Sequence, residues 1–336
     1  MDKMYSFSEI GLVPARISNV QSRKDVNPFD KDEKLPIFVA PMTCLLDSDN
    51  FSSFLSSKVI PIYPVYAKDT RDESILNQPY WISVTLAEFK NWFIDNTTPI
   101  TSCKVLIDCA NGHMAKLYDY VRQAKEKYGD KLTIMIGNIA NPWTYWVCCE
   151  AGVDYVRIGI GGGSGCTTSV QTGFHTSLPW MLEKIKEIKR LYREECMAEQ
   201  LPTFFTKIVA DGGINTVDKA IKALALGADY VMMGSMFSKC VESCGDSTYV
   251  DGKLNKAYYG QSSIEGQNDR FGYVKNHPEG VSKLVEVTTD LSTFCDEFEA
   301  VLRSAMSYAG AFSLNEFIGR IDYEIQSQAE FKKYIK

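Results

Sequence analysis

The sequence predicts a (β/α)8 barrel, and two observations carry the prediction. The chain of 336 residues contains eight short runs of apolar or β-branched residues, and amphipathic stretches separate these runs. Eight strand–helix units of this kind match a barrel, which usually takes about 250 residues. A doubly wound sheet is the alternative fold, but it rarely needs eight units that are spaced so evenly.

The predicted strands are spread between residues 37 and 235, and the clearest predicted helix lies between the sixth and the seventh. This helix covers 178–199, where apolar residues recur at three-to-four spacing while lysine and glutamate fill the other face. No proline- or serine-rich linker divides the chain, so we expect a single barrel domain over 1–336, with a short N-terminal lead-in segment and C-terminal helices. The eight predicted strands are 37–42, 59–65, 80–84, 104–110, 132–138, 155–160, 207–213 and 230–235.

Composition and charge favour a protein that binds small molecules. Of all residues, 45% are hydrophobic and 23% are charged, and the net charge of −6 argues against nucleic acid and anionic membranes as partners. The longest apolar run, 59–67, holds two prolines, and the N-terminus lacks the pattern of a signal peptide. Ten scattered cysteines without metal-binding spacing predict a reduced, cytoplasmic protein, and three histidines are too few for a histidine-rich metal site.

A barrel carries its chemistry just after the C-terminal ends of its strands, so the residues that end each run are the candidates. Polar or glycine-rich segments follow five of the eight runs. These segments hold Asp108 and Asn111, Asn138, the glycine loop from 159, Asp211 to Gly213, and Gly234 with Ser235.

The loop after the sixth run reads "IGIGGGSGCTTSVQTG" (158–173) and carries a lone cysteine, Cys166. Its glycines permit positive φ and let backbone amides approach a ligand closely. A thiol is the strongest ordinary nucleophile in proteins, and its pKa of about 8.5 falls in an amide-lined, electropositive setting. Cys166 is therefore a candidate nucleophile; the alternative is a small residue that packs a turn.

The runs "ADGGI" (210–214) and "MGSMF" (233–237) end the last two strands, where barrels often bind phosphate through backbone amides. We expect one phosphate to be held by Ser164, Gly213, Gly234 and Ser235. Asp211 would accept hydrogen bonds from ribose hydroxyls. The alternative is that each glycine pair only makes a tight turn.

Taken together, these motifs resemble the inosine monophosphate (IMP) dehydrogenase and guanosine monophosphate (GMP) reductase superfamily. The resemblance covers nearly the whole chain, and the glycine loop with its serine, cysteine and threonine in this order is its most specific part. The matching segments are "YSFSEIGLVPARISNVQSRKDV" (5–26), "FVAPM" (38–42), "IDCANGH" (107–113), "GIGGGSGCTT" (159–168), "ADGGI" (210–214), "ALGADYVMMGSMF" (225–237) and "YYGQSS" (258–263).

The resemblance implies a reaction at C2 of a purine nucleotide, where Cys166 forms a covalent thioimidate and hydride passes between C2 and a nicotinamide cofactor. Thr168 and Glu279 match the family residues that move protons, although without the resemblance Glu279 would be a solvated loop charge. Reductases use NADPH and release ammonia from GMP to give IMP. Dehydrogenases use NAD and oxidise IMP to xanthosine monophosphate.

The resemblance also implies the binding residues, a homotetramer and a possible monovalent cation, K+. Asp108, for example, matches an acidic residue beside the nicotinamide; the alternative for it is a hydrogen bond at the barrel rim. The expected substrate-binding residues are Ser164, Asp211, Gly212, Gly213, Gly234, Ser235, Gln261 and Gly280. The expected cofactor-binding residues are Asp108, Asn111, Gly112, Lys68 and Ser262, and the cation would bind at Gly161, Gly163 and Cys166.

Segment lengths favour the reductase branch of the family. Dehydrogenases usually insert a CBS-type regulatory domain near the third strand, but only about twenty residues separate the runs 80–84 and 104–110. The segment 260–279 is short, as in reductases, yet it contains Arg270, which would imitate the water-activating arginine of a dehydrogenase. The alternative, which we favour, is that Arg270 is a solvated charge on an exposed loop. The alternatives are thus a short IMP dehydrogenase and a nucleotide-binding barrel that has lost catalysis.

Several positions depart from the family pattern and bear on the substrate. Ser169 and Asn276 stand where arginines are usual, Gln261 replaces a methionine that contacts the base, and "MTCL" (42–45) replaces a sequence close to "MDTV". Lys68 is an uncertain counterpart of the lysine after the second strand. We therefore expect a divergent reductase-like member that acts on GMP or on a deoxy or base-modified analogue.

Overall fold

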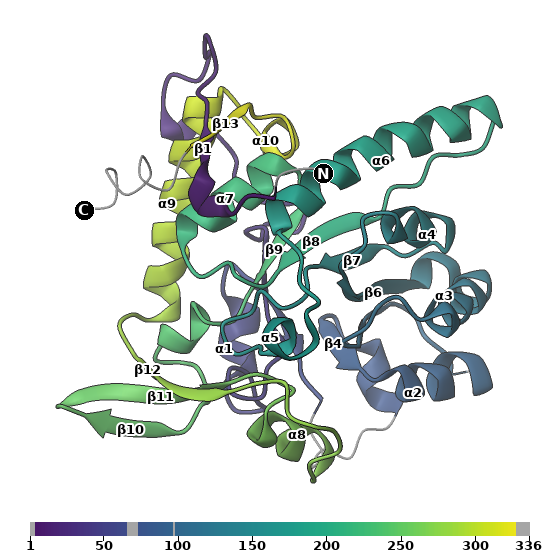
Figure 1. The fold of residues 1–336 in the computed structure, drawn as a ribbon, viewed down its shortest axis with the longest axis vertical. Coiled ribbons are helices and arrows are strands. Elements are labelled where there is room, and N and C mark those ends of the chain that lie inside the picture. The colour runs from purple at the N-terminus through teal and green to yellow at the C-terminus, as the bar shows by residue number, and fades with distance from the viewer. Residues whose placement is uncertain (1–3, 66–72, 97, 327–336) are drawn as a thin grey trace.

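The eight predicted strands form a closed parallel barrel in a computed structural model, which describes residues 4–65, 73–96 and 98–326 (Figure 1). The strands are neighbours in sequence order, and the last pairs with the first, so the predicted (β/α)8 barrel is confirmed. The barrel strands are β2 (Ile37–Val39), β3 (Ile60–Tyr63), β4 (Trp81–Val84), β5 (Cys103–Asp108), β6 (Leu132–Ile139), β7 (Tyr155–Ile158), β8 (Lys207–Asp211) and β9 (Tyr230–Met233).

Helices cover the outside of this barrel, which explains why its strands are continuous apolar runs. The predicted helix 178–199 is confirmed as α6, in which Ser177 accepts a hydrogen bond from the N–H of Trp180 at the first turn. The α-helices are α1 (Phe51–Ser56), α2 (Leu86–Phe89), α3 (Ala115–Tyr128), α4 (Thr144–Glu150), α5 (Thr168–Thr172), α6 (Leu178–Ala198), α7 (Val217–Leu226), α8 (Ile264–Phe271), α9 (Leu291–Ala309) and α10 (Leu314–Phe317). Shorter 3-10 helices are η1 (Phe7–Glu9), η2 (Arg23–Asp25), η3 (Glu73–Asn77), η5 (Gly129–Lys131) and η6 (Phe237–Lys239), and η4 (Lys90–Asp95) is a π-helix.

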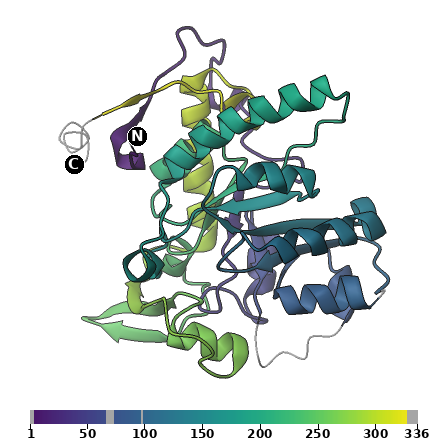
Figure 2. The ribbon, with the colours of Figure 1, turned by 45° about the vertical axis from the view of Figure 1, so that its right-hand side comes forward.

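Two small antiparallel sheets lie outside the barrel. Strand β1 (Ile10–Leu12) pairs with β13 (Tyr323–Ile325), so the segment that leads into the barrel is joined to the segment that follows α10. Strands β10 (Ser247–Val250), β11 (Lys253–Tyr259) and β12 (Ser282–Glu286) form the other sheet. Figures 1 and 2 show its hairpin projecting from the body of the protein, with α8 beside it.

The connection between β4 and β5 holds no inserted domain. Strand β4 ends at Val84 and β5 begins at Cys103, and only α2 and η4 are formed between them in the described residues. The expected absence of a CBS-type insertion at this place is confirmed. No helix in the described part of the chain combines the length and the apolar character that a membrane crossing requires.

Aromatic rings fill the barrel at the end where its strands begin. The ring of Phe38 lies 5.7 Å from that of Trp81, 6.0 Å from that of Tyr155 and 5.1 Å from that of Tyr230. The four rings come from β2, β4, β7 and β9, so they join strands from around the whole barrel. The contacts of Phe38 with Trp81 and Tyr155 are edge to face, and such a contact contributes about 0.5–1.5 kcal/mol beyond the burial of the rings.

Replacement of Phe38 by alanine should lower the free energy of unfolding by about 3–5 kcal/mol, because it leaves a cavity among the other three rings. Urea denaturation followed by far-UV circular dichroism measures the change. The control is Phe174→Ala, which removes a ring that is 73% exposed and should cost less than about 0.5 kcal/mol. Equal effects of the two substitutions would contradict this account of the core.

Candidate active site

A cavity of about 530 Å³ lies at the C-terminal ends of the barrel strands. Its walls are the ends of β5 to β9, the glycine loop, the turn after β11 and the last turn of α8. The barrel places polar groups here because parallel strands end at one common rim. Cys166, Thr168 and Glu279 all line this cavity.

The thiol, hydroxyl and carboxylate of these three residues form one hydrogen-bonded chain. The Cys166 thiol donates to Oγ1 of Thr168 at 3.2 Å, and that hydroxyl donates to Oε2 of Glu279 at 2.6 Å. All three side chains are half-buried, so a bound substrate can reach them while bulk water is partly excluded. The chain offers a path for the thiol proton to the carboxylate, which would leave a thiolate nucleophile facing the cavity.

Backbone contacts hold the nucleophile and the carboxylate in register. Cys166 and Gly280 form an antiparallel bridge, the N–H of Thr167 donates to the carbonyl of Glu279 at 2.8 Å, and that of Val281 donates to the carbonyl of Gly165 at 3.0 Å. The glycine loop thus pairs with the segment that precedes β12. Residues more than a hundred positions apart are fixed side by side by main-chain hydrogen bonds.

Glycine at position 159 is needed for the loop to leave the barrel where it does. Gly159 has φ of +118°, and a side chain on it would collide with the carbonyl of Asp211. The loop therefore passes directly over the end of β8. Gly162 then lies against Gly212 and Gly213, so the three glycines make a floor of exposed backbone.

The rim beside this floor is suited to a phosphate group. The hydroxyls of Ser164 and Tyr258 lie 3.5 Å apart, and a side chain added to Gly234 would meet the Tyr258 hydroxyl at 3.1 Å. Burial raises the pKa of Tyr258 to about 12, so its hydroxyl keeps its proton and can donate it. Ser235 also lines the cavity. Hydroxyl and amide donors without a carboxylate among them are the groups that bind phosphate oxygens.

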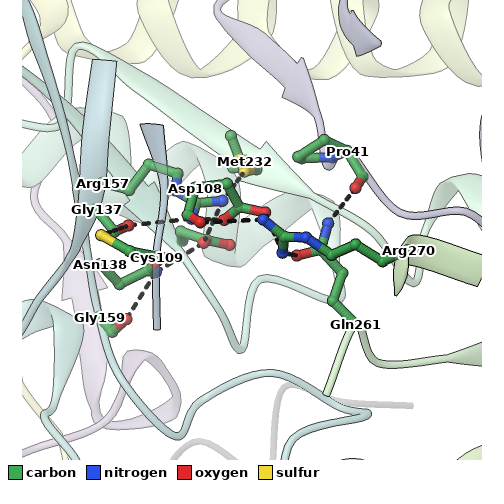
Figure 3. Close-up of polar contacts among 11 residues, drawn as sticks. Pro41, Asp108, Cys109, Gly137, Asn138, Arg157, Gly159, Met232, Gln261 and Arg270 are labelled. Atoms are coloured by element: carbon green, nitrogen blue, oxygen red, sulfur yellow. Dashed lines mark hydrogen bonds and ion pairs between the residues drawn. The ribbon is translucent and has the colours of Figure 1, made fainter. Parts of the chain in front are cut away.

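A buried guanidinium, that of Arg157 on β7, connects two of the predicted aspartates (Figure 3). It lies 2.5 Å from Oδ1 of Asp108 and 3.8 Å from Oδ2 of Asp211. Asn138 donates to the same oxygen of Asp211 at 2.8 Å. The backbone makes room for this side chain at Gly137, where an added Cβ would collide with Arg157.

A second arginine closes the other side of Asp108. Arg270 donates to Oδ2 of Asp108 at 3.2 Å, to its carbonyl at 3.1 Å and to Oε1 of Gln261 at 3.3 Å. Gln261 in turn donates to the carbonyl of Pro41. The structure therefore corrects the interpretation of Arg270 as a solvated loop charge: it lies in the last turn of α8, and its side chain is 12% exposed.

The two aspartates have opposite pKa shifts. Burial alone would raise the pKa of Asp108, but the charges of Arg157 and Arg270 outweigh burial and hold it below its ordinary value. Burial raises the pKa of Asp211, and its single arginine and Asn138 offset this only in part. Asp108 is thus held as an anion by its two arginines, whereas the charge of Asp211 is less well stabilised.

Most of the predicted site residues are brought together in the cavity. Beside the three residues of the thiol chain, its lining includes Ser164, Asp211, Gly212, Gly213, Gly234, Ser235, Gln261, Asp108, Ser262, Gly161 and Gly163. The carbonyl of Gly163 accepts the N–H of Cys166 at 3.0 Å, and a monovalent cation at this loop stays a prediction.

Three predicted residues in the described part of the chain do not line the cavity. Gly280 contributes the bridge to Cys166 rather than a wall of the cavity. Asn111 and Gly112 follow β5 without lining the cavity: the Asn111 side chain accepts the N–H of His113, and the Gly112 N–H donates to the carbonyl of Asn138. Lys68 lies outside the described residues.

Sequence reasoning missed Arg157 and Tyr258 as site residues. Arg157 stands in the apolar run 155–160, and a lone charge in a buried strand signals a partner nearby. Tyr258 begins the motif "YYGQSS". Side chains alternate between the two faces of β11, and this alternation turns Tyr258 inward, but it can be recognised only once the strand itself is known. The sequence places Asn138 at a strand end but does not predict its contact with Asp211.

Fold and site together define a (β/α)8-barrel protein whose C-terminal rim holds a cavity lined by a hydrogen-bonded thiol, hydroxyl and carboxylate. The chain belongs to the IMP dehydrogenase and GMP reductase family: the family model for the IMP dehydrogenase / GMP reductase domain matches residues 101–333. Its relatives include the GMP reductase of Clostridium acetobutylicum, 30% identical over 346 residues, which cover 98% of both chains. The GMP reductases of Shouchella clausii (98% of both chains) and Streptococcus pyogenes (96% of this chain, 95% of that protein) are each 29% identical.

Removal of the negative charge of Asp108 should destabilise the protein in a pH-dependent way. Asp108→Asn leaves two guanidinium groups facing each other, and we expect a loss of about 3–5 kcal/mol in the free energy of unfolding near pH 7. Because the folded pKa of Asp108 is depressed, its contribution is complete above its unfolded pKa of about 4 and is lost as pH falls through the folded value.

The measurement is urea denaturation of wild type and variant between pH 3 and pH 8. The difference between them should shrink below about pH 4. Asp119→Asn is the control, because it breaks an exposed ion pair with Arg122 and should cost at most about 1 kcal/mol. A difference that stays constant over the whole pH range would show that the charge of Asp108 is not what matters.

Proposed function

We propose that this protein is a GMP reductase: an oxidoreductase that converts a guanine nucleotide to its hypoxanthine counterpart with release of ammonia. The observation that carries the proposal is the chain from the Cys166 thiol through Thr168 to Glu279 inside the cavity. The relatives reported above, each named a GMP reductase and covering nearly the full chain, support the same activity.

We infer one orientation for the nucleotide in the cavity. Its phosphate would lie against Gly213, Gly234 and the hydroxyls of Ser164 and Tyr258, and its ribose hydroxyls against Asp211. The purine then extends toward Cys166, with Gln261 beside it. A volume of about 530 Å³ is within the usual range for such ligands, about 300–1,000 Å³.

The proposed chemistry consists of two changes at C2 of the guanine. The Cys166 sulfur bonds to C2 and the 2-amino group leaves as ammonia, which gives the thioimidate; addition of hydride to C2 and departure of the thiolate then give the product. Glu279 would take the thiol proton through Thr168 and return it to the leaving amine. The short contact between Thr168 and Glu279 keeps this path continuous.

A nicotinamide cofactor, when bound, supplies the hydride, and the cavity has groups that fit it. Within the described residues, Nε of Arg270 is buried without a hydrogen-bond partner, and Ser262 is exposed at the cavity wall. Arg270, Ser262 and Asp108 would hold the cofactor. Arg270 is thereby added to the cofactor-binding residues that the sequence predicts. The use of NADPH is part of the proposal, and so are the roles of Asn111, Gly112 and Lys68.

IMP dehydrogenase activity with NAD is the second candidate, and the position of Arg270 favours it. This side chain lies in the cavity rather than in solvent, where a guanidinium next to Asp108 would orient a water molecule. The absence of an insertion between β4 and β5 supports the reductase direction instead.

The proposal further includes a homotetramer in the cytoplasm, where the ten free cysteines would stay reduced.

The deciding experiment mixes the purified protein with NADPH and one nucleotide in each reaction: GMP, deoxy-GMP or a base-modified analogue. Loss of absorbance of the reduced cofactor should accompany equimolar release of ammonia. The nucleotide with the highest kcat/KM identifies the substrate. No turnover with any of them, together with turnover of IMP and NAD, would replace the reductase assignment by the dehydrogenase one.

Substitutions in the thiol chain should separate the role of Cys166 from that of Glu279. Cys166→Ala should abolish turnover and the covalent adduct that mass spectrometry detects in the wild type, because the nucleophile is missing. Glu279→Gln should lower kcat by about 10²–10⁴-fold with little change in KM. The control is Glu265→Gln, an exposed carboxylate of the first turn of α8. Wild-type kcat in Glu279→Gln would contradict the proton path.

A further inference from the structure

A second cavity, of about 470 Å³, lies at the opposite end of the barrel. Every barrel strand contributes its first or second residue to the wall, so the cavity lies on the barrel axis where the strands begin. It shares no lining residue with the catalytic cavity. The volume is again in the range that small-molecule sites occupy, about 300–1,000 Å³.

Aromatic rings separate the two cavities and provide one wall of the second. Trp81 and Tyr155 meet edge to face at 5.2 Å, and Tyr155 lies 5.8 Å from Tyr230. Side chains two residues apart on a strand point to the same side, so Tyr155 and Arg157 both face the barrel interior. A planar ligand at the strand starts would therefore stack on rings that are held by the barrel itself.

The carboxylates around this cavity are largely satisfied within the protein. Asp30 accepts the Tyr230 hydroxyl at 3.0 Å and the backbone N–H groups of Asp32 and Lys34. Asp154 pairs with Lys125 at 2.6 Å and accepts a backbone N–H at 2.7 Å. The side chain of Asp32 is exposed at the rim.

Four lysines line the wall: Lys31 is exposed, and Lys34 donates to the carbonyls of Leu55 and Ser57. The other two, Lys104 and Lys207, are half-buried and have no such partner among the described residues. Nζ of Lys207 lies over the rings of Tyr155 and Tyr230, at 5.3 Å and 5.6 Å from their centres. Neither Lys104 nor Lys207 has a carboxylate within 4.0 Å among the residues whose positions are described. Both are half-buried at the starts of β5 and β8, so two lysines without an ion pair contribute to the wall of an aromatic cavity.

We propose that this cavity is a second ligand site, which binds a small aromatic anion. Its ring would lie against Trp81, Tyr155 and Tyr230, and its negative group against Lys104 and Lys207. An anion gains charge-assisted hydrogen bonds from both lysines, and these are about twice as strong as neutral ones. A phosphate or a carboxylate on the aromatic molecule would serve equally, so the chemistry is shared by nucleotides and aromatic acids.

The test uses isothermal titration calorimetry with two probes, adenosine 5′-monophosphate and 4-hydroxybenzoate, on full-length protein saturated with GMP. We expect at least one probe to bind with one site per chain. Lys104→Gln and Lys207→Gln should each weaken that binding by about tenfold. Lys131→Gln is the matched control, because Lys131 is exposed just before β6 at the same end of the barrel and does not line the cavity.

Two further measurements keep the test decisive. GMP turnover should be unchanged in the glutamine variants, which would show that they are folded. If a glutamine variant does not fold, Lys104→Arg or Lys207→Arg replaces it, and the arginine variant should retain binding because it keeps the positive charge. The probe should quench tryptophan fluorescence in the wild type and not in Trp81→Phe. Binding of neither probe, or binding that both lysine substitutions leave unchanged, would overturn the proposal.

Discussion

The buried guanidinium of Arg157 is the interaction on which the catalytic rim depends. It enters the barrel from β7 and lies between Asp108 at the end of β5 and Asp211 at the end of β8. Two carboxylates and one guanidinium cannot be buried separately, because each unpaired charge would cost several kcal/mol. Pairing fixes the relative positions of three strand ends, and Arg270 adds α8 to the same cluster. The rim is therefore held together by charge rather than by apolar packing.

Uneven sharing of positive charge gives the two aspartates different properties. Asp108 has close contacts from two arginines and remains an anion, whereas Asp211 has one distant arginine and an asparagine. Asp108 and Asp211 are thus the same residue type at the ends of two parallel strands, and their pKa values differ because their neighbours differ. The cysteines show the same effect: burial raises the pKa of Cys44, Cys103 and Cys240 to about 12, which keeps them as inert thiols.

The fold could be predicted from the sequence because barrel strands are buried on both faces and therefore appear as continuous apolar runs. The residues that follow those runs, such as Ser164 and Asp211, could be placed at one rim for the same reason. Contacts between strands could not be predicted, since they depend on register: Arg157 reaches Asp108 only because Gly137 leaves room for its side chain. Arg270 was misjudged because α8 was not foreseen, and a helix decides which way that arginine points.

The bridge between Cys166 and Gly280 has a consequence for how a nucleotide can enter. The glycine loop and the segment before β12 are one small two-stranded ladder, in which Thr167 and Glu279 are joined through the main chain. In the proposed function, a displacement that admits a purine would carry both halves of this ladder together. The sulfur, the hydroxyl and the carboxylate would then travel as a rigid unit, and the proton path would survive each opening and closing of the site without having to be rebuilt.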